Sequence, residues 1–165
     1  MAISDKERNL RASILDRLFD DEPNVSVDSE HSRQRKLKDL RNSVRRDLES
    51  LLNARYRVIS PPEQFEQLST SLLNYGLPDL ATVNMLDVVK RQEFTRNIEH
   101  IIRTYEPRFK SVKVSYIDNT RSTDRTLRFR IDAVMYADPA PEVIVFDSVL
   151  EPVLRTVTVE ESLHG

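Results

Sequence analysis

The triplet Glu106-Pro107-Arg108 has the clearest potential chemistry in this chain, because it places an acid and a cation on either side of a proline. A carboxylate in the last turn of a helix faces the negative end of the helix dipole, where cations are preferred. Pro107 also pushes the backbone of Glu106 toward an extended conformation. The charge of Glu106 therefore requires a compensating cation.

Two interpretations of the triplet are open on these residues alone. In the first, Glu106 forms an internal ion pair with Arg103, Arg108 or an arginine of the preceding helix. An exposed pair of this kind would stabilise the fold by well under about 1 kcal/mol. In the second, the proline holds the acid and the arginine side by side for bidentate recognition by a partner protein.

Sequence motifs for nucleotide and acyl-transfer chemistry are missing. The chain has no phosphate-binding loop, dinucleotide fingerprint or nucleophile elbow, and its two glycines leave little backbone for a phosphate cradle. Without cysteines, and with its three histidines scattered, it predicts neither a zinc site nor a serine–histidine pair. We therefore expect no metal and no cofactor. The histidines are His31, His100 and His164.

A glycosidase is the enzymatic alternative. Such an enzyme needs one protonated carboxyl in an apolar pocket and a second, ionised carboxyl about 5–9 Å away. Nothing in the sequence sets the separation of the candidate acids, and we expect the protein to act by binding rather than by catalysis. The candidate acids are Glu99, Glu106, Asp118 and Asp124.

Two amphipathic helices precede and position the triplet. Apolar residues at steps of three and four predict helices from about Arg33 to Arg55 and from Asp87 to Tyr105, the second ended by Pro107. Between them, residues 69–80 read as a turn-rich connection. The helical apolar residues are Leu37, Leu40, Val44, Leu48, Leu51 and Leu52, then Phe94, Ile98, Ile101, Ile102 and Tyr105.

After Arg108 the hydrophobic period changes from that of a helix to two, which predicts β-strands. The expected strands are 112–116, 127–131, 143–146 and 154–159, with a polar hairpin loop over 118–125 and a rigid turn over 138–141. Because helices precede strands, we predict an α+β fold. Its amphipathic helices would pack on a small, mainly antiparallel C-terminal sheet.

The chain is expected to form one main domain with a tethered helix. Residues 1–22 contain a short amphipathic pattern and are expected to form a docking helix, with a linker over 23–32, a domain over 33–160 and a disordered tail over 161–165. No apolar run approaches the roughly 20 residues of a membrane span, and a signal-peptide core is missing. We expect a cytoplasmic protein without membrane insertion.

Basic charge concentrates in residues 33–57, which carry nine basic and three acidic side chains. At about 100° per residue, Arg41 falls inside the edge of the apolar stripe, Arg45 lies just beyond it and Arg46 points nearly opposite. Only one aromatic residue in this span could stack on bases, and acidic segments at both ends of the chain would repel phosphates. We interpret the basic face as solvated and expect no nucleic acid.

Five stretches of the chain, in order, resemble a known family: the TssE subunit of bacterial type VI secretion baseplates. That family is related to a lysozyme-like baseplate wedge protein of contractile phages. The resemblance covers most of residues 13–140. The stretches are 13–23, 43–55, 71–80, the triplet, and 127–132 leading to Asp138-Pro139.

The resemblance implies a structural component of the baseplate wedge, similar in fold to the interlocking domain of the contractile sheath. Its implied partners are the TssF and TssG core, TssK, and the TssB/TssC sheath, to whose first ring it would offer strands and so initiate assembly, which agrees with recognition by strand addition. It would act in the cytoplasm as part of a membrane-docked apparatus. A lysozyme label implies no activity by itself, so peptidoglycan cleavage is the alternative.

The resemblance also associates the acid and the arginine of the triplet with holding the wedge core. We therefore predict partner-binding residues at Glu106, Pro107 and Arg108, with supporting contacts from basic residues of the preceding helix. Those residues are Arg41, Arg45 and Arg46.

Overall fold

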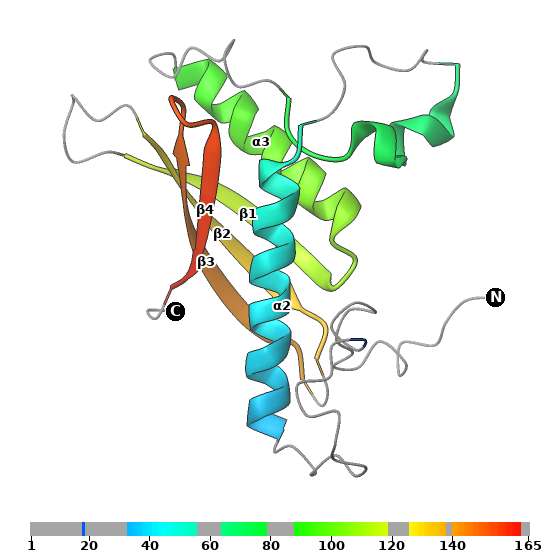
Figure 1. Ribbon diagram of the computed structural model, residues 1–165, viewed down its shortest axis with the longest axis vertical. Coiled ribbons are helices and arrows are strands. Elements are labelled where there is room, and N and C mark those ends of the chain that lie inside the picture. Colours follow the sequence, from blue (N-terminus) through cyan, green and yellow to red (C-terminus); the bar gives the residue numbers. More distant parts are fainter. Residues whose placement is uncertain are drawn as a thin grey trace.

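The computed structural model describes Leu18 and residues 33–55, 64–78, 88–118, 126–137 and 140–162. Its helices precede its strands, as the α+β prediction requires (Figure 1). The helices are α2 (Arg33–Asn53) and α3 (Val88–Tyr105), with the short 3-10 helices η2 (Glu66–Thr70) and η3 (Leu72–Asn74) between them. The strands are β1 (Phe109–Ile117), β2 (Leu127–Met135), β3 (Glu142–Glu151) and β4 (Thr156–Glu161).

The four strands form one antiparallel sheet in the order β1-β2-β3-β4, so each strand pairs with its neighbour in the sequence. Side chains alternate between two faces, as the period of two predicts. In β2, every second residue from Leu127 to Met135 is buried, while Arg128 on the opposite face is exposed. One face of the sheet therefore carries the core.

Helices α2 and α3 bury that face. Figure 1 shows α2 running alongside β4, and α3 packs against β1. Their predicted apolar stripes join the inner face of the sheet in one core cluster. The largest fully buried side chains are Phe129, Phe146, Leu48, Leu52, Leu77, Ile98, Ile102, Ile131, Met135, Ile144, Leu150 and Val44.

The segment 64–78 is fastened to both helices. The Tyr105 hydroxyl donates to the Ser71 carbonyl at 2.9 Å, and the Leu77 amide donates to the Ala54 carbonyl at 2.9 Å. Gly76 has φ 107°, and a Cβ there would lie 2.5 Å from the Ala54 oxygen. Only glycine fits this close approach, so the glycine sets how the segment meets the end of α2.

The structure differs from the sequence prediction mainly at element ends. The fourth strand begins at Thr156 rather than Leu154, because residues 152–155 form a hairpin turn in which Arg155 takes φ 55°. Helix α2 ends at Asn53, and Arg55 instead forms an isolated parallel bridge with Leu77.

Several predicted features lie wholly or largely outside the described residues. These are the N-terminal helix, the linker before residue 33, most of the loop over 118–125 and the end of the tail. Leu18 alone represents the first of them, as a helical and exposed residue. The domain boundaries therefore stay predictions. Among the described helices, none is long and apolar enough to cross a membrane.

Candidate functional site

The triplet forms the corner at which α3 turns into β1. The Glu106 amide donates to the Ile102 carbonyl at 2.8 Å and so completes the last turn of α3. The Glu106 carbonyl then accepts the Phe109 amide at 3.3 Å, which closes a tight turn over Pro107. The fixed φ of proline suits this position, and its ring is exposed at the corner. Local backbone chemistry therefore accounts for the sharp change of direction.

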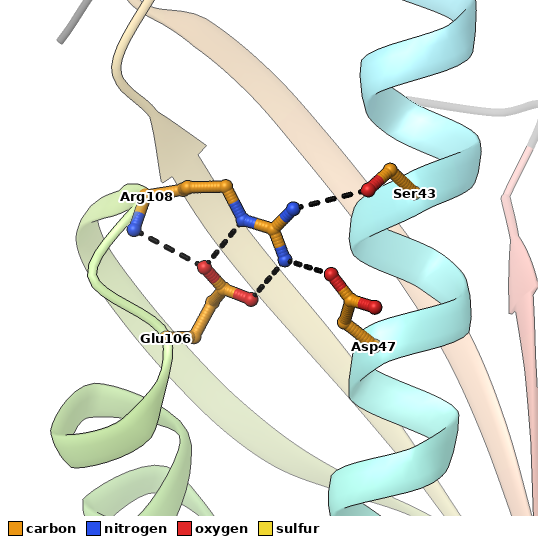
Figure 2. A network of polar contacts seen from close by, with 4 residues as sticks. All are labelled: Ser43, Asp47, Glu106 and Arg108. Atoms are coloured by element: carbon orange, nitrogen blue, oxygen red, sulfur yellow. Dashed lines mark hydrogen bonds and ion pairs between the residues drawn. The ribbon is translucent and has the colours of Figure 1, made fainter. Parts of the chain in front are cut away.

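Glu106 and Arg108 form a bidentate ion pair beneath that corner (Figure 2). Arg108 Nε donates to Glu106 Oε1 at 2.7 Å, and Nη2 donates to Oε2 at 2.5 Å. The Arg108 backbone amide adds a third bond to Oε1 at 3.1 Å. Glu106 is only 5% exposed, so this acid obtains its compensating cation from within the chain.

The same guanidinium reaches across to α2. Arg108 Nη2 donates to Asp47 Oδ2 at 2.6 Å, and Nη1 donates to Ser43 Oγ at 3.2 Å. Ser43 and Asp47 lie one helical turn apart, so both face the corner (Figure 2). We call these four residues the corner clamp: Ser43, Asp47, Glu106 and Arg108. The clamp fastens α2 to the junction of α3 and β1.

The corner clamp carries two carboxylates and one guanidinium. Burial alone would lower the pKa of Arg108, but the hydrogen bonds and charge of Glu106, followed by those of Asp47, raise it above its ordinary value. Burial raises the pKa of Tyr75, and the negative charges of Asp47 and Glu106 raise it further. The arginine is therefore firmly charged, and the excess negative charge is felt by the neighbouring tyrosine.

The geometry shows how the internal ion pair is built. Of the three cations considered for Glu106, Arg108 makes the contact, whereas Arg103 bonds Glu99 at 2.9 Å. Arg41 and Arg45 lie one turn apart on α2, beside Ser43, and contact residues of β3 and β4 instead. Arg41 bonds Glu142 at 3.4 Å and Glu161 at 3.2 Å, and Arg45 bonds Glu49 at 3.1 Å and the Val159 carbonyl at 3.3 Å. Arg46 is exposed on α2.

Sequence reasoning missed Ser43 and Asp47, although α2 carries a signal for them. At about 100° per residue, Asp47 falls within about 20° of Leu40, inside the apolar stripe that packs on the sheet. A carboxylate at such a position must meet a buried or half-buried cation. The pattern predicts that a cation exists, but it does not tell which one.

The candidate acids of the glycosidase alternative that the structure describes do not form the pair of carboxyl groups that such an enzyme needs. Glu106 is held by Arg108, and Glu99 bonds Arg103 and accepts the Val114 amide at 3.2 Å. Asp118 is largely exposed beside Arg91, at 3.7 Å, and Asp124 lies outside the described residues. A general acid is instead kept protonated in an apolar pocket. Among the described residues, no group of three or more metal-binding side chains is arranged to hold an ion.

The fold and the corner clamp define a class of protein: a small α+β scaffold in which buried and half-buried polar side chains connect the helices to the sheet. A family model described as baseplate wedge protein gp25 matches residues 38–140, from α2 through β2. The chain belongs to this baseplate wedge family, and its role is structural, within a baseplate where it associates with other baseplate components. No curated protein and no solved structure matches the chain.

Proposed function

We propose that this chain is the TssE-type wedge subunit of a type VI secretion baseplate. In this role it binds the TssF and TssG core beside TssK, and it initiates assembly of the TssB/TssC sheath. The observation that carries the proposal is the family match over residues 38–140, since that span contains every residue of the corner clamp.

The corner clamp supports the first half of the proposal. The side chains of Arg108 and Asp47 are 21% and 39% exposed, whereas the side chain of Glu106 is 6% exposed. A partner would therefore touch Pro107, Asp47 and the outer side of Arg108. The contacts with Glu106, Asp47 and Ser43 use four of the five side-chain N–H groups of Arg108, leaving one on Nη1 for an acceptor of the partner.

This arrangement gives Glu106 and Arg108 different parts in the proposed site. Glu106 is the positioning residue, because its carboxylate holds the guanidinium in one orientation. Arg108, Pro107 and Asp47 form the surface that meets the wedge core. The two interpretations of the triplet are thus compatible: an internal pair orients a partner-facing arginine.

The sheet supports the second half of the proposal. A four-stranded antiparallel sheet with two edge strands can accept a further strand from another chain. An incoming strand would pair with backbone groups and would leave the helix-covered core undisturbed. A peptidoglycan-cleaving glycosidase has no comparable support, because Glu106 is tied to Arg108.

The proposed core contact is tested with a variant that changes the surface and leaves the clamp intact. Pro107→Lys replaces an exposed ring at the corner, so the fold should persist while co-purification with TssF and TssG is lost. Replacing an exposed lysine of α3 by Lys90→Ala gives a matched surface control, which should bind like the wild-type chain.

The clamp variant Glu106→Gln tests whether Glu106 acts by orienting Arg108. It keeps the shape of the side chain and removes the charge that orients Arg108, so both stability and binding should fall. If Pro107→Lys binds TssF and TssG normally while Glu106→Gln is merely less stable, the corner is structural only. The proposed binding site would then be wrong.

A further inference from the structure

The two edges of the sheet, on β1 and β4, each direct alternate backbone groups away from the neighbouring strand. Along an antiparallel strand pair, one pair of opposite residues exchanges backbone hydrogen bonds, and the next pair directs its backbone N–H and C=O groups away from the partner strand. On β4, the backbone amide and carbonyl of Val157 bond the side chain of Asn53 on α2 and therefore point away from β3. Because the pattern repeats every second residue, the backbone groups of Val159 and Glu161 point the same way. On β1, the same rule assigns the outward positions to Val112, Val114 and Tyr116.

The β4 edge is already occupied by a substitute for a strand. Asn53 Nδ2 donates to the Val157 carbonyl at 2.8 Å, and the Val157 amide donates to Asn53 Oδ1 at 2.8 Å. A side-chain amide is chemically a peptide unit, so Asn53 satisfies both groups as a neighbouring strand would. Arg45 bonds the Val159 carbonyl at 3.3 Å, and Arg55 bonds the Arg155 carbonyl at 2.8 Å.

The β1 edge is covered more loosely, by two charged side chains of α3. Glu99 accepts the Val114 amide at 3.2 Å, and Arg103 donates to the Val112 carbonyl at 3.3 Å. Each makes one long bond, and Arg103 is 64% exposed. Glu99 and Arg103 also bond each other at 2.9 Å, so they can leave the edge and keep an ion pair on the helix.

Charge also distinguishes the two edges. Strand β1 carries the exposed residues Lys110 and Lys113 and no acid, whereas β4 carries Glu160 and Glu161 and no base. Lysines on an edge strand discourage pairing with a second copy of the same edge, because like charges would meet. They favour a strand that bears acidic side chains.

We infer that the β1 edge is the acceptor for an added strand, and that the incoming segment is extended and acidic. It pairs with the outward groups of Val112, Val114 and Tyr116 and displaces the side chains of Glu99 and Arg103. The β4 edge stays closed by Asn53. This inference rests on the proposed function, in which a sheath subunit supplies the strand.

Amide hydrogen exchange on the wild-type chain tests the inference directly. The chain is mixed with the TssB/TssC heterodimer from the same bacterium, and exchange at β1 and β4 is compared with and without it. We expect exchange of the Val112 and Tyr116 amides to slow about tenfold or more, because a new strand would accept their hydrogen bonds. Exchange at Val159 and Glu161 should be unchanged.

Two sets of variants give the inference a second readout. The pair Glu99→Ala with Arg103→Ala removes the competing side chains, so the heterodimer should bind about threefold or more tightly. Asn53→Ala, the matched change at the other edge, should leave affinity unaltered. The pair Lys110→Glu with Lys113→Glu should weaken binding about tenfold and reduce its salt dependence, whereas Lys90→Glu should not.

The failures of the two proposals differ. A complex that forms with slower exchange at β4, or at neither edge, overturns the β1 inference and leaves the sheath role standing. Weaker binding after the pair Glu99→Ala with Arg103→Ala also counts against it. If no complex forms with the folded chain, the sheath part of the proposed function is itself wrong, and the edge inference falls with it.

Discussion

The corner between α3 and β1 and the flank between α2 and β4 are both joined by polar side chains, but their burial differs. At the corner, Glu106 lies almost fully buried against Arg108. At the flank, ion pairs such as Arg41–Glu161 are about one-third exposed on both partners. Removing charges from water is costly and must be offset by close hydrogen bonding. The corner is therefore the place where polar geometry is specified most strictly.

The flank also contains an uncharged contact, between Asn53 of α2 and the backbone of β4. Asn53 satisfies two backbone groups without burying a charge, and it lies on the exposed side of α2. Such a contact closes an edge at little electrostatic cost. The corner clamp orients a charged group, whereas the flank mainly prevents unwanted pairing. Four predictions separate these two roles, from the largest expected effect to the smallest.

Glu106→Ala should destabilise the fold by about 3 kcal/mol, because it leaves the half-buried Arg108 without its bidentate partner. Urea unfolding measures this change. The exposed acid Glu93 on α3 provides the control, and Glu93→Ala should change stability by less than about 0.5 kcal/mol. Equal effects of the two variants would contradict the buried clamp.

Asn53→Ala should cost about 1 kcal/mol, because both hydrogen bonds to Val157 are lost but water can reach the freed groups. The same unfolding assay applies. Asn42→Ala, at an exposed position on the same helix, is the matched control. A loss as large as that of Glu106→Ala would mean that the flank contributes as much to stability as the corner does.

Arg41→Ala should change stability by less than about 1 kcal/mol, since its ion pairs with Glu142 and Glu161 are partly exposed. Adding 1 M salt should shrink the difference further because it screens these charges. Thermal melts at low and high salt measure both effects. A large, salt-independent loss would place Arg41 in the same category as Arg108.

Tyr75→Phe should make the protein less sensitive to alkaline pH. Because folding raises the pKa of Tyr75, the unfolded chain ionises first, and stability is lost as pH rises above about 10. The phenylalanine variant lacks this contribution. Unfolding measured at pH 8 and pH 10.5 gives the comparison, and an identical pH slope for both proteins would show that folding does not raise the pKa of Tyr75.

Local periodicity was sufficient to predict the helices and the class of the fold. The stripe from Leu40 to Leu52 and the alternation from Leu127 to Ile131 depend on residues near in sequence. The details at α2 depend on distant partners instead. Ser43 and Asp47 meet Arg108 only because α2 crosses the α3–β1 corner, and Asn53 meets Val157 only because α2 runs beside β4.

The triplet shows the same division within three residues. The cost of an acid at the end of α3 could be predicted from the helix dipole, and so could the need for a cation. The identity of the cation that pairs with Glu106 depends on the turn over Pro107, because this turn brings the side chain of Arg108 back to Glu106. The turn is local, but the reach of the guanidinium to α2 is not.

Photo-crosslinking from position 107 tests the central claim most directly. A benzoylphenylalanine at position 107 would lie at the exposed corner above the clamp. A benzoylphenylalanine at position 160, an exposed position of β4, would serve as the control. If the corner meets the wedge core, irradiation of assembled baseplates should join position 107 to TssF or TssG, and position 160 to neither. Crosslinks from position 160 with none from position 107 would contradict it.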